Sequence, residues 1–279
     1  MTNLDDFIKL ALAEDIGPGD YTSLACIPTD ALGKAKLLVK DEGIAAGVEL
    51  AGLILHHVDP LLKVTLFIKD GQPIKHGDII LHVEGRSQSI ATAERLVLNC
   101  MQRMSGIATL TAKYVEQLNG LPTKLLDTRK TNPLFRHLEK WAVRIGGGHN
   151  HRFGLFDMMM IKDNHVDYSG GIKQAIQKAN EYLKKYQLNL KIEIETRSLN
   201  EVQAVLDYGN VDRIMLDNFS INELHAAVKL INKKFETEAS GGITIESIRP
   251  YAETGVDFIS CGAITHSAPN FDLSLKAFN

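Results

Sequence analysis

Short apolar segments recur from residue 124 onward, separated by helical or loop stretches, and this alternation constrains the fold more than any other feature. The segments are KLLD (124–127), MMMIKD (158–163), KIEIET (191–196), RIMLD (213–217), FETEAS (235–240) and FISCG (258–262). Amphipathic stretches at 172–186 and 222–234 are typical of helices that pack on a sheet. Such alternation favours parallel strands joined by crossover helices, in either an α/β barrel or a doubly wound sheet.

Polar residues end nearly every one of these segments, and their positions favour the barrel. They are Arg129-Lys130, Lys162-Asp163, Glu195, Asp217, Ser240-Gly241-Gly242 and Gly262. The carboxyl ends of barrel strands form one ring around an active site, whereas an open sheet gathers residues only at its switch point. We therefore expect these strand ends to surround one pocket.

Residues 1–107 have a different organisation, which predicts a separate α+β unit. The expected elements are helices over the first 14 residues, at 47–58 and at 89–118, and strands at 34–40 and within 64–85. Gly17-Pro18-Gly19 ends the first helix, and Ser105-Gly106 is the expected break in the long one.

Charge is distributed unevenly along the 279 residues. The net charge of −3 argues against general affinity for nucleic acid. Residues 124–165, however, hold eight basic and four acidic side chains, a local charge of +4. A cationic segment within an acidic chain predicts a site for a small, multiply charged anion.

The sequence also predicts a cellular location. No apolar run reaches the roughly 18 to 20 residues of a membrane span, and residues 1–20 carry acidic residues where a signal peptide carries basic ones. We expect a cytoplasmic protein that does not bind membranes. Cys26, Cys100 and Cys261 are widely spaced, which favours ordinary small apolar residues over disulfides or a thiolate zinc site.

Two cationic motifs are candidate anion ligands. Arg129 and Lys130 combine a bidentate guanidinium with a compact ammonium, although a solvated loop pair has the same sequence. The second motif holds Gly146–Gly148, which permit close backbone approach to a ligand. His149, His151 and Arg152 follow these glycines. The two histidines lack a third metal ligand at a recognisable spacing, so a structural role is expected for His149.

The remaining strand ends supply carboxylates and small-residue turns. Lys162 follows an apolar run and is expected to pair with a bound anion or, alternatively, with Asp163 or Glu195. Glu195 and Asp217 suit ribose hydroxyls, water-mediated Mg²⁺ or a developing oxocarbenium ion, with pairing to lysines as the alternative. Backbone N–H groups in ASGGI (239–243) and SCGA (260–263) suit phosphate.

Taken together, the motifs resemble the quinolinate phosphoribosyltransferase family. They are EDIGPGDYTS, AERLVLNCMQRMSGIAT, DTRKT, VRIGGGHNHRFGLFDMMMIKDNH, EIET, LDNF, EASGGI and GVDFISCGAITHS. The resemblance implies an N-terminal α/β sandwich over 1–107, completed by the tail 268–279. It also implies an incomplete parallel α/β barrel of six or seven strands over 108–267, and a homodimer, or a higher oligomer, with shared active sites.

The resemblance also implies roles for individual residues. Arg129, His151, Arg152 and Lys162 would surround quinolinate, Lys130 would lie between the two substrates, Arg95 would reach the site of the partner subunit, Glu195 and Asp217 would hold ribose hydroxyls and Mg²⁺, and Ser240, Gly241, Gly262 and Ala263 would bind the 5-phosphate. Of these, Lys130, Lys162, Glu195 and Asp217 would be catalytic. Ala239 stands where the family is expected to allow serine, which leaves the backbone turn unchanged.

The implied activity is transfer of a phosphoribosyl group from 5-phosphoribosyl 1-diphosphate to quinolinate with decarboxylation. The products would be nicotinate mononucleotide, CO₂ and diphosphate, in NAD biosynthesis. Three alternatives remain: a nicotinate phosphoribosyltransferase, the related protein of molybdenum operons, and a non-catalytic sensor of phosphate or nucleotide.

Overall fold

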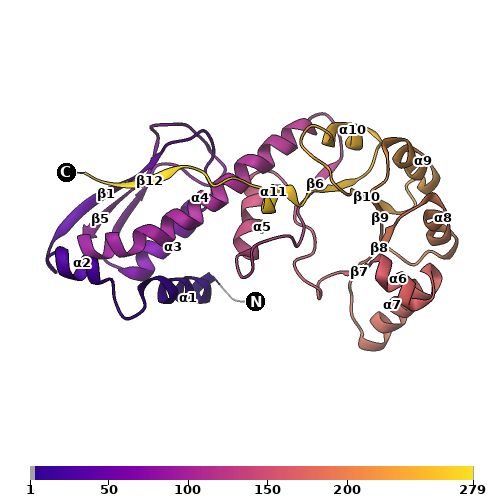
Figure 1. Ribbon diagram of the computed structural model, residues 1–279, viewed down its shortest axis with the longest axis horizontal. Coiled ribbons are helices and arrows are strands. Elements are labelled where there is room, and N and C mark those ends of the chain that lie inside the picture. The colour runs from indigo at the N-terminus through magenta and orange to yellow at the C-terminus, as the bar shows by residue number, and fades with distance from the viewer. Residues whose placement is uncertain (1–3, 279) are drawn as a thin grey trace. The chain divides into compact units, whose positions relative to one another are not determined.

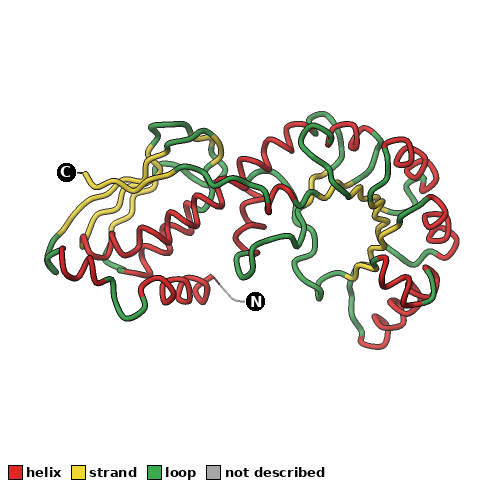
Figure 2. Tube along the Cα trace, in the orientation of Figure 1, coloured by secondary structure: helices red, strands yellow, loops and turns green. Residues whose placement is uncertain are grey.

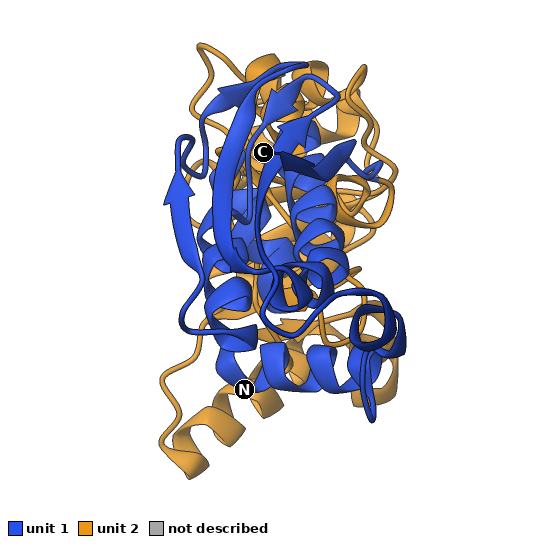
Figure 3. Ribbon diagram, turned by 90° about the vertical axis from the view of Figure 1, so that its left-hand side faces the viewer, with its two compact units in different colours: residues 1–110, 137–146, 268–279 blue, residues 111–136, 147–267 orange. Residues whose placement is uncertain are grey.

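The computed structural model describes residues 4–278, which separate into two compact units (Figure 3). We call residues 1–110, 137–146 and 268–279 the sandwich unit. Residues 111–136 and 147–267 form the barrel unit.

The sandwich unit is built on a four-stranded antiparallel sheet in the order β12-β1-β5-β3. Its strands are β1 (Leu32–Val39), β3 (Lys63–Leu66), β5 (Ile79–Arg86) and β12 (Leu273–Phe278), and β2 (Gly43–Ile44) pairs with β4 (Pro73–Ile74). The helices are α1 (Leu4–Ile16), α2 (Tyr21–Cys26), α3 (Val48–Val58) and the first part of α4 (Ser87–Gln117). Helices α3 and α4 lie on one side of the sheet (Figure 1).

Cross-strand apolar pairs explain why the C-terminal strand joins this sheet. Leu37 of β1 lies opposite Leu81 of β5 on one side and Leu275 of β12 on the other. All three are buried, and the burial of such neighbours stabilises antiparallel strands. The predicted α/β sandwich is therefore confirmed, with strand β12 paired to β1.

The expected break at Ser105-Gly106 is wrong, because α4 continues through both residues. Ser105 is buried, and its hydroxyl both accepts from the backbone N–H of Ala46 and donates to the Ala46 carbonyl. A Cβ on Gly106 would overlap the carbonyl oxygen of Pro269. The small pair lets neighbouring backbone approach the helix and does not interrupt it.

Residues 137–146, which hold most of helix α5 (Arg136–Ile145), belong to the sandwich unit, although the sequence predicts them within the barrel segment 108–267. Within that unit, the fully buried carboxylate of Glu139 accepts hydrogen bonds of 2.9 Å from Nε and from the terminal NH2 group of Arg103. This long-range ion pair joins α5 to α4.

The barrel unit contains six parallel strands in the order β6-β11-β10-β9-β8-β7. They are β6 (Lys124–Leu126), β7 (Met159–Ile161), β8 (Ile192–Thr196), β9 (Arg213–Asp217), β10 (Glu236–Ser240) and β11 (Phe258–Ser260). Its helices include α6 (Asp163–Ser169), α7 (Ile172–Tyr186), α8 (Leu199–Tyr208), α9 (Ile221–Ile231), α10 (Ile248–Glu253) and α11 (Ala263–His266). The strands curve around a common centre, with helices outside (Figure 2).

The sheet is open, so the predicted incomplete barrel is confirmed with six strands. Among residues 4–278, β7 pairs only with β8, while β6 has a short additional neighbour at His149. The His149 N–H donates to the Leu125 carbonyl at 2.8 Å, and the Asp127 N–H donates to the His149 carbonyl at 3.1 Å. This parallel bridge brings the segment after His149 to the barrel interior.

Serine caps explain where two of the outer helices begin. The hydroxyl of Ser198 accepts from the Glu201 N–H at the start of α8, and Ser220 forms a capping box with Glu223 at the start of α9. These caps follow β8 and β9, so each chain segment turns sharply from the strand end into its helix.

In the part of the chain that the structure describes, every helix is too short or too polar to cross a lipid bilayer.

Candidate active site

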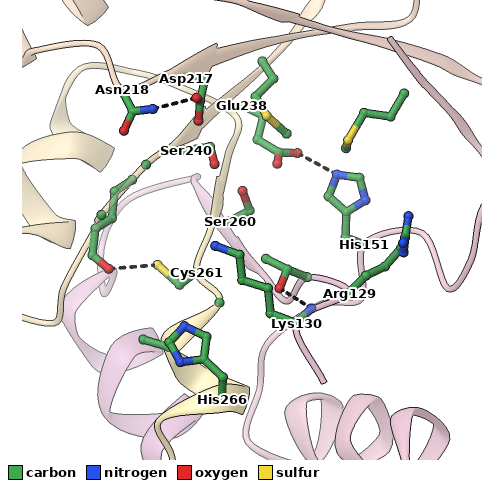
Figure 4. Close-up of a pocket in the computed structure, with 18 of the residues that line it drawn as sticks. Arg129, Lys130, His151, Asp217, Asn218, Glu238, Ser240, Ser260, Cys261 and His266 are labelled. Carbon is green, nitrogen blue, oxygen red and sulfur yellow. Dashed lines mark hydrogen bonds and ion pairs between the residues drawn. The ribbon is translucent and has the colours of Figure 1, made fainter. Parts of the chain in front are cut away.

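A pocket of about 770 Å³ lies at the carboxyl ends of the barrel strands, and all of its lining residues belong to the barrel unit (Figure 4). Met215 and Asp217 of β9 and Glu238 and Ser240 of β10 line it. Because side chains two residues apart share one face of a strand, these pairs point toward the same interior.

Four cationic side chains line the pocket: Arg129, Lys130, Arg152 and Lys162. Burial and the nearby charge of Arg129 both lower the pKa of Arg152. Like charges held together in a concave site favour binding of an anion. The structure thus brings together half of the eight basic residues in 124–165.

Arg136 holds the main chain beside two of these cations, Arg129 and Arg152. Its Nε donates to the Thr131 hydroxyl at 2.9 Å, and one of its terminal NH groups donates to the Phe153 carbonyl at 3.0 Å. The other terminal NH group lies 3.5 Å from the Arg129 carbonyl. Arg136 therefore connects the loop that carries Arg129 to the loop that carries Arg152.

Lys130 is held through its main chain. Its N–H donates to the Thr128 hydroxyl at 3.0 Å, and its carbonyl accepts from the Thr265 hydroxyl at 2.8 Å. The side chain extends toward Ser240 and Ser260 (Figure 4). The ammonium thus faces the middle of the pocket.

Lys162 pairs with Glu195, which was one of the alternatives for this lysine. Its Nζ donates to Glu195 Oε2 at 2.8 Å. Glu195 is only 9% exposed and is not itself among the residues that line the pocket, whereas Lys162 is half-exposed there. The predicted ligand Glu195 therefore lies beneath the pocket surface, neutralised by Lys162.

Asp217 lines the pocket, and Asn218 fixes its carboxylate. The Asn218 side-chain amide donates to Asp217 Oδ2 at 2.6 Å, and its backbone N–H donates to the Ser240 carbonyl at 2.8 Å. A Cβ on Gly241, where φ is +108°, would collide with the Asn218 side chain. Only glycine therefore allows the 240–242 turn to lie against Asn218.

The second small-residue turn also lines the pocket. A Cβ on Gly262 would lie 2.8 Å from Lys130 Cδ and 3.1 Å from His266 Cδ2. Gly262 and Ala263 line the pocket, and so do Ser240 and Gly241. All four predicted phosphate-binding residues thus lie at the pocket.

His151 is buried between two carboxylates at the pocket floor. Its Nε2 lies 3.0 Å from Glu193 Oε2 and 3.4 Å from Glu238 Oε2, and Arg213 donates to Glu238 Oε2 at 2.8 Å. Nδ1 accepts the Arg152 N–H at 2.7 Å, so the ring proton lies on Nε2. Figure 4 shows the ring facing Glu238.

One proton is shared within this group. Burial opposes protonation of His151, but the contacts with Glu193 and Glu238 outweigh burial and raise its pKa to about 9. Burial and the charge of Glu238 raise the pKa of Glu193 to about 7. Since Nδ1 is an acceptor, the additional proton resides between Nε2 and Glu193. The two carboxylates carry two negative charges, and Arg213 and the additional proton carry two positive ones. The group as a whole is therefore neutral.

The ligand atoms of His151, Glu193 and Glu238 lie within 4.8 Å of one another, which suits a metal ion in distance. Arg213 and the shared proton already neutralise both carboxylates, so no negative charge remains to attract a divalent cation. The carboxylates at the ends of β8 and β9, Glu195 and Asp217, are hard oxygen donors of the kind Mg²⁺ prefers.

Other predicted residues lie elsewhere. Gly146, Gly147 and Gly148 do not line the pocket, so the close approach to a ligand expected of them is not found there. His149 is exposed and forms its contacts through its backbone. Arg95 is exposed on α4 of the sandwich unit and is not among the lining residues.

Sequence reasoning missed several polar lining residues: Thr128, Asn218, Glu238, Thr244, Ser260 and His266. Candidates were drawn from strand ends and from motifs, and residues within the strands or their neighbours in the loops were not considered. Glu238 was detectable, because it stands two residues before Ser240 and so shares its face.

A parallel α/β barrel whose strand ends surround four cations and two glycine turns is typical of one class of protein. This class consists of barrel enzymes whose substrates carry phosphate and carboxylate groups.

The sequence matches the family described as "Quinolinate phosphoribosyl transferase, C-terminal domain" over residues 107–276 and the corresponding N-terminal domain over 20–105. A relative from Arabidopsis thaliana, "Nicotinate-nucleotide pyrophosphorylase [carboxylating], chloroplastic", is 49% identical over 98% of this chain and 82% of its own. A "Probable nicotinate-nucleotide pyrophosphorylase [carboxylating]" from Synechocystis is 39% identical over 98% and 92%. The solved nicotinate-nucleotide pyrophosphorylase from Francisella tularensis superimposes with a TM-score of 0.91 at 40% identity, covering 99% of this chain and 96% of that one. The chain belongs to the quinolinate phosphoribosyltransferase family.

Proposed function

We propose that this protein transfers the phosphoribosyl group of 5-phosphoribosyl 1-diphosphate to quinolinate and releases CO₂. The products are nicotinate mononucleotide and diphosphate, in the biosynthesis of NAD. Relatives named quinolinate phosphoribosyltransferase [decarboxylating], such as the Nicotiana tabacum enzyme at 46% identity, support the assignment. The single observation that carries it is the convergence of Arg129, Lys130, Arg152 and Lys162 on one pocket.

Quinolinate explains this demand for positive charge because it carries two carboxylates. We assign its binding to the wall formed by Arg129, His151, Arg152 and Lys162. The two arginines offer bidentate hydrogen bonds, and Lys162, which now pairs with Glu195, offers a point charge. Substrate binding would draw Lys162 from Glu195 toward the carboxylates.

The phosphoribosyl diphosphate would lie across the glycine turns. Ser240, Gly241, Gly262 and Ala263 offer backbone N–H groups and a hydroxyl to its 5-phosphate, and Lys130 would lie between the two substrates. Glu195 and Asp217 would hold ribose hydroxyls and Mg²⁺. When bound, Mg²⁺ would neutralise the diphosphate and so improve it as a leaving group.

The reaction follows from charge. The pyridine nitrogen forms a bond to ribose C1 as the bond from C1 to diphosphate breaks, and the carboxylates of Glu195 and Asp217 stabilise the oxocarbenium character. The ring nitrogen becomes cationic. The C2 carboxylate then leaves as CO₂, its electron pair remains on C2 beside the cation, and C2 takes up a proton. The protein positions the two substrates and neutralises their charges, and the reaction needs no covalent nucleophile.

We propose that the working form is a homodimer in which Arg95 of the partner subunit completes each pocket. The exposed position of Arg95 on α4 is consistent with contact to another chain. The cytoplasmic location expected from the sequence stays a prediction.

A product assay tests the proposed function. The purified protein is incubated with Mg²⁺, 5-phosphoribosyl 1-diphosphate and either quinolinate or nicotinate, and CO₂ and nicotinate mononucleotide are measured. We expect both products from quinolinate and none from nicotinate. Product from nicotinate alone, or binding of quinolinate without turnover, would overturn the proposal in favour of a nicotinate enzyme or a sensor.

A further inference from the structure

Three charged side chains that the proposed reaction does not use lie inside the barrel. Glu193 and Glu238 are fully buried, and Arg213 is 8% exposed. Barrel interiors are usually filled by branched apolar side chains, and removing ions from water costs several kcal/mol per ion unless they are well paired. Such a group therefore needs a reason beyond packing.

Two of these side chains, Glu193 and Glu238, contact His151, and the third holds Glu238. Glu193 provides the shorter contact, at 3.0 Å from Nε2, and Glu238 lies at 3.4 Å while Arg213 holds it at 2.8 Å. The ring is itself only 5% exposed. Strands β8, β9 and β10 thus each contribute one charged residue to fix a single imidazole.

The imidazole in turn holds the main chain of the pocket wall. Its Nδ1 accepts the Arg152 backbone N–H at 2.7 Å, and the Asp127 carboxylate accepts the His151 backbone N–H at 2.8 Å. With Nε2 at 3.0 Å from Glu193, both ring nitrogens face partners inside the protein. From this backbone position, the Arg152 guanidinium reaches the Met158 carbonyl at 3.2 Å and the Met160 sulfur at 3.6 Å.

We propose that Glu193 and Glu238 are positioning residues: they clamp His151, which holds the backbone of Arg152 and so aims its guanidinium at a carboxylate of the substrate. The inference rests on the proposed function for the identity of the substrate. Misplacement of a binding group by as little as 1 Å is enough to weaken a substrate complex severely.

Two substitutions of Glu193 test the clamp. Glu193→Leu removes the carboxylate that lies 3.0 Å from Nε2, and we expect it to raise KM for quinolinate at least tenfold while KM for 5-phosphoribosyl 1-diphosphate changes less than twofold. Glu193→Gln retains an acceptor oxygen, and we expect it to keep KM for quinolinate within threefold of the wild type. A residue needed only for folding would not separate the two substrates in this way.

Glu236→Leu is the matched control. Glu236 lies on β10 two residues before Glu238 and also contacts Arg213, but it is 40% exposed and has no contact with His151. Its KM values should equal those of the wild type. The proposal is overturned if Glu193→Leu leaves KM for quinolinate unchanged, or if it raises both KM values equally.

The contacts of His151 with Glu193 and Glu238 can also be tested without substrate. In ¹⁵N-histidine NMR spectra, with the His151 signal assigned by its loss in His151→Gln, we expect a ring protonated at Nε2 and accepting at Nδ1. Glu238→Gln, which provides a second variant should Glu193→Leu not fold, should shift that signal, whereas Glu236→Leu should not. A His151 signal insensitive to both carboxylates contradicts the clamp. A wild-type protein with the clamped ring but no turnover of quinolinate would contradict the proposed function instead.

Discussion

At the residue scale, the cationic side chains of the pocket repel one another, and a bound anion would offset this repulsion. Burial lowers the pKa of Arg152, and the charge of Arg129 lowers it further, because the two guanidinium groups repel each other. Lys162 avoids similar repulsion by pairing with Glu195. An anion with two carboxylates would offset these repulsions, and this explains why the cations gather at one place.

Removing one cation should therefore weaken quinolinate specifically. We expect Arg152→Ala to reduce its binding free energy by about 2 kcal/mol or more, because a charged group of the ligand loses its partner. Isothermal titration calorimetry measures this value. Arg249→Ala, on the outer helix α10, is the control and should not change it. Unchanged affinity in a folded Arg152→Ala protein would remove Arg152 from the site.

The additional proton that His151 shares with Glu193 predicts a dependence of stability on pH. The group releases this proton at the raised pKa of His151, about 9 in the folded protein against an ordinary value of 6.5. Its contribution to the free energy of unfolding is fully present below pH 6.5 and is lost as the pH rises through 9, by at most about 3 kcal/mol. Urea unfolding at pH 6.5 and 9.5 should show a larger loss for the wild type than for His151→Gln. Equal losses would contradict the raised pKa.

Residues at strand ends could be predicted because parallel strands finish at one edge. That reasoning found Lys130, Lys162 and Asp217. It could not find the contact between His151 and Glu193, because that contact depends on how a segment outside the strands enters the barrel. No local pattern encodes such a contact.

At the scale of elements, periodicity located strands and helices well, and glycine was harder to interpret. A glycine within a helical pattern indicates either a break or a close approach of other backbone. Gly106 is the second kind, since the segment at Pro269 packs on it. The packing partner lies far along the chain, so the local sequence favoured the wrong alternative.

Two helical glycines of the sandwich unit provide a matched pair of substitutions. We expect Gly106→Ala to destabilise the protein by about 2 kcal/mol or more, because its Cβ would meet the Pro269 carbonyl. Gly52→Ala in α3 has no atom within 4 Å of the new Cβ and should stabilise by about 0.5–1 kcal/mol. Thermal unfolding measures both. Similar Tm shifts for the two variants would contradict the close approach at Gly106.

At the scale of the whole molecule, the chain contributes distant segments to each unit. The tail pairs as β12 with β1, and residues 137–146 join the sandwich unit through Glu139. The tail was expected there only through the family resemblance. The position of 137–146 could not be predicted, because it follows from a buried ion pair with Arg103.

A shared active site should allow two inactive subunits to complement each other. Arg95→Ala and Lys162→Ala proteins are expected to be inactive alone. After equal mixing and subunit exchange, about half of the dimers are mixed, and each mixed dimer holds one intact pocket of its two. The mixture should therefore regain about a quarter of the wild-type activity. Exchange is verified by a mass tag on one subunit. Verified exchange without recovered activity would show that Arg95 does not serve the partner's pocket.

The proposed activity depends on one pocket that matches two carboxylates, and the ratio of two affinities tests this match directly. Quinolinate and nicotinate differ by one carboxylate, so the wild-type protein should bind quinolinate at least about 30-fold more tightly, the equivalent of about 2 kcal/mol for one lost charged contact. Equilibrium dialysis of both ligands against the same protein provides the ratio. Equal affinities, or tighter binding of nicotinate, would contradict the account.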